Sequence, residues 1–486
     1  MNRRKLLQAA AAAALAVATR NGNLRAADSN GISDSAFWKL APTPPMGWNS
    51  YDTYGSTVTE AEYFANAQYM SNHLLQRGYN YAVIDYLWFD PAQASRCVRD
   101  REPLAMDKYG RLLPALNKFP SARGGVGFRP IAEKMHGMGL KFGFHVMRGI
   151  PRRAVAANAP IEGSNFTARD AADIHSTCPW NLDMYGVRGD TAAGQAYYDS
   201  LIRLYHSWGT DFIKVDNLSR TYHRAEIHAI RRALNKYGPG IVFSASPGPT
   251  PVSEGNDIEH HANMWRIRDD LWDSWPILNN LIDMVAVWKG LAGPGHWPDC
   301  DMICLGHIGL RSVGGPRMTH FTMDEQLAMM TLFAIAPSPL FLGTELTRMD
   351  PWTLSLIANS EMLAINQDPL GAQGIRVRRH GPVESWAKKL HNGDVAMAIF
   401  NRGDYGQYVT ASTLRPAYDI VINRGGYDGR GYDGQHAVAS WIGLGLHERA
   451  VVRDIWSQRT LGEFNGSISL PVASHGARLL RIVRPV

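Results

Sequence analysis

The sequence predicts an α/β fold: a (β/α)8 barrel over residues 43–371, followed by a C-terminal antiparallel β-sandwich over residues 373–486. Up to residue 371, eight short apolar runs alternate with helical patterns, which is typical of a barrel. Beyond it, turns rich in Gly, Asn and Asp separate short alternating runs, as in a sandwich. No GxGxxG motif opens a helix after the first run, which disfavours an open dinucleotide-binding sheet.

Residues 1–27 have the pattern of an export signal. A basic stretch at residues 3–5 precedes an apolar, alanine-rich stretch at residues 6–18 that is too short to span a bilayer. Small residues near Ala26 offer a cleavage site, and the Arg pair is compatible with the twin-arginine route. We therefore expect an exported protein, either periplasmic or extracellular.

The composition is that of an ordinary globular protein, with 45% hydrophobic and 19% charged residues. The formal net charge is +6, but residues 1–27 contain five basic residues and no acid, so the rest of the chain carries about +1. No basic surface remains that would predict nucleic-acid or membrane binding. The four cysteines include no CxxC pair, so we expect neither a disulfide-dependent fold nor a zinc site.

The barrel strands follow one another along the chain. After the first, at residues 46–51, Thr59 and Glu62 form a capping box that begins a helix ending at Gly78. Helical patterns also precede several of the later strands. Two long segments, 89–128 and 148–190, are expected to build a substrate site. The other predicted strands are 81–88, 140–145, 211–217, 241–246, 264–267, 301–305 and 339–343, and the sandwich runs are 383–386, 395–399, 450–452, 468–470 and 479–482.

Carboxylates gather at the ends of these predicted strands. Asp85, Asp216, Asp270 and Asp301 lie at or just beyond such ends, which converge on one mouth of a closed barrel. Such a mouth suits glycosidic cleavage, which needs an acid and a base or nucleophile around the anomeric carbon. It also suits divalent-metal binding, for which His145 and Asp85 would be ligands. A sugar-binding protein without activity would not need both Asp216 and Asp270.

Five segments in order carry a resemblance to a known family. They are PMGWNS at 45–50, FIKVDN at 212–217, WRIRDDLWDSW at 265–275, GPGHWPDCDM at 293–302 and AINQDPLG at 364–371. On these segments the sequence resembles glycoside hydrolase family 27, the family of retaining α-galactosidases, over nearly its whole length after the signal. The resemblance implies a barrel with a C-terminal sandwich, a carbohydrate substrate and no metal or other cofactor. It leaves open whether the protein forms a homo-oligomer.

The resemblance also implies roles for single residues. Asp216 takes the place of the nucleophile and Asp270 that of the acid/base, in a double displacement with net retention. Lys214, two residues before Asp216 on the same face of the strand, is expected to bind the sugar and to lower the pKa of Asp216. Arg266 takes the place of a contact to the 2-hydroxyl region. The other expected sugar contacts are Asp85, Trp48, Tyr51, Tyr86, His145, Ser246 and Asp301, with Asp299 as the alternative to Asp301.

Several positions that recognise the sugar in this family carry different residues in this chain. The family usually has two adjacent Asp residues that hold the galactose 4- and 6-hydroxyls, whereas this chain has Asp85 followed by Tyr86. Tyr51 replaces a stacking Trp, His145 replaces a Tyr, and Ser246 stands where many α-galactosidases have Glu. From the resemblance we expect release of terminal α-D-galactosyl residues by exo-action, and the departures leave alternatives open. The alternatives are β-L-arabinopyranosides, which match α-galactosides in stereochemistry, α-N-acetylgalactosaminides and α-glucosides.

Overall fold

The computed structural model describes residues 36–92, 104–246, 248–404, 406–412, 432–439, 449–465 and 467–483. The predicted export signal at residues 1–27 and Cys97 lie outside these residues. Cys178, Cys300 and Cys304 are buried free thiols. No helix in the described part of the chain is both long and apolar enough to cross a membrane.

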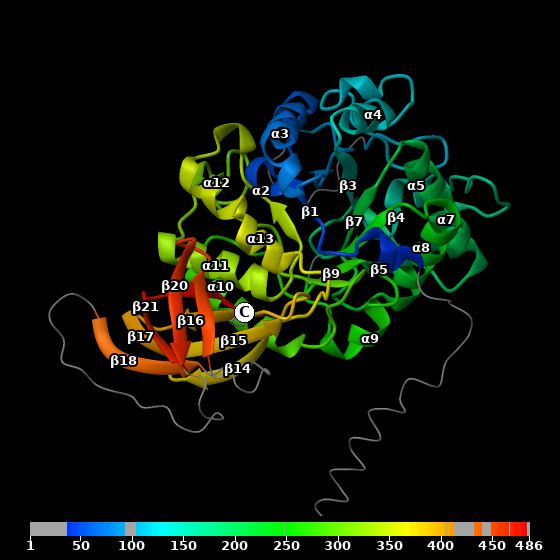
Figure 1. The fold of residues 1–486 in the computed structure, drawn as a ribbon. Coiled ribbons are helices and arrows are strands. Elements are labelled where there is room, and N and C mark those ends of the chain that lie inside the picture. The colour runs from blue at the N-terminus through cyan, green and yellow to red at the C-terminus, as the bar shows by residue number, and fades with distance from the viewer. Residues whose placement is uncertain are drawn as a thin grey trace, which may run out of the picture. The chain divides into compact units, whose positions relative to one another are not determined.

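Eight parallel strands form the first sheet, in the order β10-β9-β8-β7-β3-β2-β1-β13. This order follows the chain, and the last strand, β13, returns to pair with the first, β1, in the register Met46 with Leu340. That is the connectivity of the predicted barrel, and connecting helices lie outside the strands (Figure 1). The strands are β1 (Met46–Asn49), β2 (Tyr81–Ile84), β3 (Lys141–Met147), β7 (Phe212–Asp216), β8 (Val242–Ala245), β9 (Met264–Arg266), β10 (Trp297–Asp299) and β13 (Leu340–Leu342).

The helices begin where the sequence carries capping residues. Thr59 accepts a hydrogen bond from the Glu62 amide, and Glu62 bonds back to the Thr59 amide, which confirms the predicted capping box. Tyr63, Ala67, Met70 and Leu74, which lie on one face of this helix, are buried. The helices that connect the barrel strands are α2 (Tyr51–Tyr54), α3 (Glu60–His73), α4 (Arg129–Gly137), α7 (Ala192–Ser207), α8 (Arg224–Tyr237), α9 (Gly255–Ile258), α10 (Trp275–Val287) and α11 (Met323–Ile335), with α12 (Pro351–Ile357) and α13 (Ser360–Asn366) after the last strand.

The seventh barrel strand differs from the prediction. It is β10 at Trp297–Asp299, not residues 301–305, because Asp301 has a positive φ of 86° that ends the strand direction. The sequence did not predict a strand at this segment, because proline, here Pro298, is rare in central strands. It is tolerated because β10 ends the hydrogen-bonded order of the sheet, where a missing N–H costs little. Ile303 instead bridges in parallel to Leu342 and so links the two ends of the sheet.

The second long segment folds into a small unit of its own. It holds a three-stranded sheet in the order β4-β6-β5, of which β6 pairs antiparallel with both neighbours. This unit follows β3, at the end of the strands where barrel enzymes bind substrate. Its elements are β4 (Ile150–Pro151), α5 (Arg152–Ala156), α6 (Ala168–Ala171), β5 (Ala172–Thr177) and β6 (Met184–Val187).

The C-terminal strands form two further sheets, with the orders β14-β15-β16-β22-β19-β20 and β18-β17-β21. The first is antiparallel throughout, as predicted, whereas β17 and β18 are parallel. Both faces of β16 are buried: Met397 packs in the core of the C-terminal domain, and Ala398 joins the cluster that contains α11. The strands are β14 (Ile375–His380), β15 (Val383–Lys389), β16 (Val395–Asn401), β17 (Gly406–Ser412), β18 (Tyr432–Ala439), β19 (Arg449–Asp454), β20 (Arg459–Asn465), β21 (Ser467–Val472) and β22 (Ala477–Val483), drawn from gold to red in Figure 1.

One buried carboxylate gathers arginines in this C-terminal domain. Glu384 has no solvent exposure and forms ion pairs with Arg402 at 2.6 Å and with Arg376 at 3.0 Å. Arg402 also pairs with Asp283 of α10, at 2.7 Å. Glu384 therefore connects β15 to the arginines that contact the barrel helix.

We expect Glu384→Ala to lower the free energy of unfolding by about 3 kcal/mol or more, because it removes the fully buried carboxylate of this group and leaves Arg402 and Arg376 with only the partly exposed Asp283. Chemical denaturation followed by circular dichroism measures this. Glu463→Ala is the matched control, since Glu463 pairs with Arg449 on the surface, and we expect it to cost about 0.5 kcal/mol or less. Equal losses in the two variants would contradict the assigned role of Glu384.

Candidate active site

The barrel interior is built in an apolar and a polar layer. Side chains alternate along each strand, so every second residue faces inward. Phe212, Val242, Met264 and Phe341 share one apolar cluster with Trp297 inside the barrel. Closer to the carboxyl ends of the strands, the side chains become polar. This second layer contains Asn49, Asp85, His145, Lys214, Asp216, Ser244, Arg266 and Asp299.

Lys214 and Asp85 form the central ion pair of the polar layer. The Lys214 amino group donates to Oδ2 of Asp85 at 2.8 Å, and Asn49 Nδ2 donates to the same oxygen at 2.7 Å. The Tyr86 amide donates to Oδ1 of Asp85 at 2.8 Å, while Ser50 Oγ accepts from the Asp85 amide. Burial alone would raise the pKa of Asp85, but Lys214 and the other donors bring it to about 2. Asp85 is therefore an ionised acceptor with a fixed orientation.

Asp216 ends β7 and is bonded to a histidine. His145 Nε2 lies 2.9 Å from Oδ2 of Asp216, and both side chains are buried. Oδ1 of Asp216 has no hydrogen-bond partner among the described residues. Burial raises the pKa of Asp216, and His145 and Lys214 only partly oppose this. Lys214 lowers the pKa of Asp216, as expected, but burial outweighs this effect and the net shift is upward.

Arg266 organises a second group of carboxylates. It is buried at the end of β9, with Nη1 at 2.6 Å from Asp301 and Nη2 at 3.2 Å from Asp270. The other oxygen of Asp301 accepts from the Leu271 amide at 2.7 Å, directly after Asp270. The side chain of Asp270 is 52% exposed, whereas that of Asp301 is only 2% exposed. Asp301 therefore holds Arg266 and the chain beside Asp270, and Asp270 is open to solvent.

Tyr51 interacts electrostatically with carboxylates of both groups. Burial raises the pKa of its hydroxyl, and so do the negative charges of Asp270, Asp85 and Asp216. The charge of Asp270 also raises the pKa of Asp216. These side chains come from the ends of β2, β7 and β9 and from the start of α2, so the fold gathers them at one mouth.

Two other residues expected at the sugar lie in different settings. Trp48 packs on Tyr54 and Tyr63 and donates to the Thr344 carbonyl, with no exposure, so its placement at the sugar is wrong. Strand alternation explains this, because Asn49 faces inward and its neighbour Trp48 faces the helices. Ser246 is fully buried after β8, and its Oγ has no partner among the described residues. A contact between Ser246 and a sugar stays a prediction.

The side chain of Tyr86, beside Asp85, is held by one hydrogen bond and by two aromatic contacts. Its hydroxyl accepts from Asn181 Nδ2 at 2.7 Å. Its ring lies edge-on to His145 at 5.3 Å between centroids and to Trp180 at 5.8 Å. Burial and the charge of Asp216 raise the pKa of the Tyr86 hydroxyl. Tyr86 is therefore a neutral phenol at the mouth, with its ring and hydroxyl both fixed.

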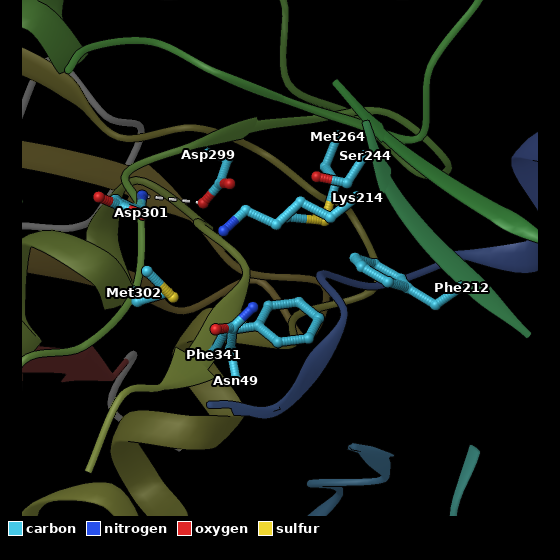
Figure 2. Close-up of a pocket in the computed structure, with 9 residues that line it drawn as sticks. All are labelled: Asn49, Phe212, Lys214, Ser244, Met264, Asp299, Asp301, Met302 and Phe341. Carbon is cyan, nitrogen blue, oxygen red and sulfur yellow. Dashed lines mark hydrogen bonds between the residues drawn. The ribbon is translucent and has the colours of Figure 1, made fainter. Parts of the chain in front are cut away.

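A small cavity of about 20 Å³ lies below the polar layer, at the boundary with the apolar one. Figure 2 shows the Lys214 side chain crossing it, with the amino group on the side of Asp299. Its volume suits one or two water molecules. It is too small for a sugar, which would have to bind above it, at the open ends of the strands. Its lining residues are Asn49, Phe212, Lys214, Ser244, Met264, Asp299, Asp301, Met302 and Phe341.

The residues proposed as metal ligands are engaged otherwise. His145 is bonded to Asp216, and Asp85 to Lys214 and Asn49. In the described part of the chain, the one group of three residues with ligand atoms close together is His228, Asp257 and His261, outside the mouth. The charged side chains of the mouth are thus paired with one another.

Sequence reasoning missed several residues of this site. Asn49 and Ser50 form hydrogen bonds with Asp85. Asn49 ends β1 and Ser50 follows it, just as Asp85 follows β2, so a search for polar residues at all strand ends would have found both. Asn181 lies in the unit after β3, where no periodic pattern points to its bond with Tyr86. Asp52 is a buried carboxyl whose pKa is raised well above its ordinary value by burial and by the charge of Asp301. Only the fold reveals it.

The comparisons with known proteins decide the family. A solved GH27 β-L-arabinopyranosidase from Geobacillus stearothermophilus is 43% identical, with 93% of this chain and 99% of that chain covered and a TM-score of 0.85. The chain belongs to glycoside hydrolase family 27. The profiles of "Alpha galactosidase A" and of the "Alpha galactosidase C-terminal beta sandwich domain" match this family-27 glycosidase at residues 181–368 and 380–482.

More distant relatives carry other substrate names. Alpha-galactosidase 2 of Arabidopsis thaliana is 26% identical to this glycosidase, over 92% of this chain and 90% of its own. The alpha-N-acetylgalactosaminidase of Mus musculus is 28% identical, over 84% and 86%. The proteins that this chain resembles over most of its length thus differ in the sugar that their names give.

The pH dependence of sugar binding should report on Asp301. Burial raises the pKa of Asp301 to about 6, although Arg266 opposes this. Lowering the pH through 6 therefore protonates Asp301 and weakens its ion pair with Arg266. We expect the wild-type KM to rise below pH 6, and Asp301→Asn to show a KM raised about tenfold at pH 7, the value of one charged hydrogen bond. Initial rates between pH 5 and 8 measure both.

A KM of the Asp301→Asn variant that rises below pH 6 as steeply as that of the wild type would contradict this assignment. The kcat values from the same runs serve as the internal control, since Asp301 is expected to act on binding.

Proposed function

We propose that this family-27 glycosidase releases terminal β-L-arabinopyranosyl residues with retention of configuration, and that terminal α-D-galactosides are its second substrate. The observation that carries the proposal is the Tyr86 ring, held by Asn181 beside the ionised Asp85. The galactoside activity was the first expectation from the sequence, and the contacts of Tyr86 favour its alternative.

The two sugars differ at one position of the ring. β-L-Arabinopyranose has the configuration of α-D-galactopyranose, but carries only hydrogen where galactose has its hydroxymethyl group at C5. Family members usually offer two carboxylates at this corner, one for the 4-hydroxyl and one for the 6-hydroxyl. Here Asp85 supplies one carboxylate, and the neutral Tyr86 stands in place of the other. A site built to bond a hydroxyl discriminates strongly, and a pentose loses nothing at a corner that lacks such a group.

The degree of similarity supports the same choice. The chain is 43% identical to the β-L-arabinopyranosidase, compared with 26% for the α-galactosidase of Arabidopsis thaliana. The α-galactoside stays as the second candidate because Asp85, Lys214 and Asn49 form an intact acceptor and donor group for a hydroxyl with the configuration that both sugars share.

The proposed reaction is a double displacement. Ionised Asp216 attacks the anomeric carbon while Asp270, as an acid, gives its proton to the leaving oxygen. A water molecule then attacks the same carbon, Asp270 takes up the proton, and the bond to Asp216 breaks. Asp270 is open to solvent, which suits proton delivery to a leaving group and deprotonation of water. Asp216 is buried beside its hydrogen-bond donor, which suits attack on a bound sugar.

A panel of nitrophenyl glycosides tests the substrate. We expect kcat/KM to be highest for the β-L-arabinopyranoside, about tenfold or more above the α-D-galactoside. The α-N-acetylgalactosaminide and the α-glucoside should react far more slowly still. A preference for the galactoside would overturn the proposed order, and inversion in the released sugar, seen by proton NMR, would overturn the mechanism.

The matched controls in this assay are variants of Asp216. Asp216→Asn keeps the shape of the side chain and should abolish turnover while the thermal unfolding curve stays close to that of the wild type. Asp216→Gly supplied with azide should form the glycosyl azide whose anomeric configuration is opposite to that of the substrate. The same configuration as the substrate would show that Asp216 is not the nucleophile.

Tyr86→Asp should move the preference toward galactosides. It places a carboxylate where a 6-hydroxyl would lie, and a hydrogen bond to a charged group is worth about 1.5–3 kcal/mol, which corresponds to a shift of roughly 10- to 100-fold in the ratio of kcat/KM values. The ratio for the galactoside and arabinopyranoside is the measured quantity. Tyr86→Phe is the matched control, because it removes the bond to Asn181 without adding an acceptor. An unchanged ratio in Tyr86→Asp would contradict the proposed role of this corner.

A further inference from the structure

The two oxygens of Asp216 have different surroundings. Oδ2 lies 2.9 Å from His145 Nε2, whereas Oδ1 has no hydrogen-bond partner among the described residues. The side chains of His145 and Asp216 are 1% and 9% exposed, so bulk water does not replace either contact. An ionised carboxylate only accepts hydrogen bonds, so Nε2 must carry the proton of this one. Within the described ranges, no donor reaches the buried Oδ1.

The fold fixes the histidine ring in this position. His145 lies on β3 in register with Lys214 of β7, and Met147 is in register with Asp216. Trp88 Nε1 donates to the His145 carbonyl at 2.6 Å, and the Tyr86 ring packs edge-on against the imidazole. His145 Nδ1 has no partner among the described residues. Nε2 is therefore the nitrogen through which the ring acts on Asp216, and the contacts of Trp88 and Tyr86 hold it there.

Charged groups also surround the pair. Lys214 acts on Asp216 from within the same strand, and the charge of Asp270 acts on it from the segment after β9. Asp85, after β2, interacts electrostatically with His145. His145 thus lies close to both positively and negatively charged side chains, and its Nε2 donates its hydrogen bond to the buried carboxylate of Asp216.

We infer that His145 is a positioning residue for the nucleophile: it holds Oδ2 of Asp216 and leaves Oδ1 as the oxygen that attacks the anomeric carbon. This rests on the proposed double displacement. In the first step, the bond from Oδ1 to the anomeric carbon forms as the bond to the leaving oxygen breaks, and the leaving oxygen takes the proton of Asp270. In the second, water gives its oxygen to the carbon and its proton to Asp270, and the bonding electron pair returns to Asp216.

The hydrogen bond from His145 acts in both steps, but with different weight. In the first it only orients a carboxylate that is losing its charge. In the second the carboxylate is the leaving group, and a donor on Oδ2 stabilises the charge that returns to it. Loss of the donor should therefore slow release of the sugar from the enzyme more than its attachment.

Variants of His145 with and without a donor test this. His145→Phe and His145→Met lack a donor, whereas the amide of His145→Gln can donate from nearly the same place. With nitrophenyl β-L-arabinopyranoside, whose good leaving group makes the second step limiting, we expect the donor-free variants to lose roughly 10²-fold in kcat, the scale of a misplaced catalytic group. We expect the Gln variant to recover most of that loss, and thermal unfolding checks that each variant folds.

Intact-mass spectrometry during turnover gives the second readout. The donor-free variants should accumulate enzyme carrying one pentosyl group on Asp216, and their KM should fall as the intermediate builds up. Donor-free variants with kcat within about twofold of the wild type would overturn the inference, and so would a Gln variant as slow as the donor-free ones. Absence of any pentosyl enzyme together with an inverted product in the wild type would instead refute the proposed double displacement.

Discussion

The site depends on the cost of burying several carboxylates in one end of a barrel. Asp85, Asp216 and Asp301 are all nearly excluded from water, and a buried carboxylate is stable in its ionised form only if cations or donors compensate it. Lys214 of β7 pairs with Asp85 after β2, Arg266 of β9 pairs with Asp301 just beyond the adjacent β10, and His145 of β3 is bonded to Asp216. A substrate therefore meets a group of charges whose positions are set before it binds.

The same constraint separates the two proposed catalytic residues. Asp216 is enclosed, bonded through one oxygen and surrounded by the barrel, while Asp270 stands on a bend after β9 with half of its side chain in solvent. Two carboxyl groups of one amino-acid type thus have different environments, which is the general way in which proteins give such groups different roles. Asp301 fixes the environment of Asp270, because it holds Arg266 with one oxygen and the chain beside Asp270 with the other.

The neighbours of the sugar site show how one fold carries several specificities. Asp85 and Lys214 come from barrel strands or their ends and have fixed partners. Asn181 and Trp180, which hold Tyr86, come from the small unit inserted after β3. Asn181 and Trp180 contact Tyr86, whereas Lys214 and Asn49, which bind Asp85, belong to the barrel strands. This suits a family whose members carry the names of different sugars.

The sequence by itself determined the alternation of strands and helices, the change to a sandwich near residue 371, and the gathering of Asp85, Lys214, Asp216 and Arg266 toward strand ends, because these follow from periodicity and from the convergence of parallel strands. It could not locate β10, whose Pro298 is acceptable only at the end of the hydrogen-bonded order. It also could not tell that Trp48 faces outward, that Lys214 bonds Asp85 instead of Asp216, or that His145 takes Asp216. Tertiary structure alone decided these points, since each depends on which of several nearby partners lies within hydrogen-bond distance once distant strands are brought together.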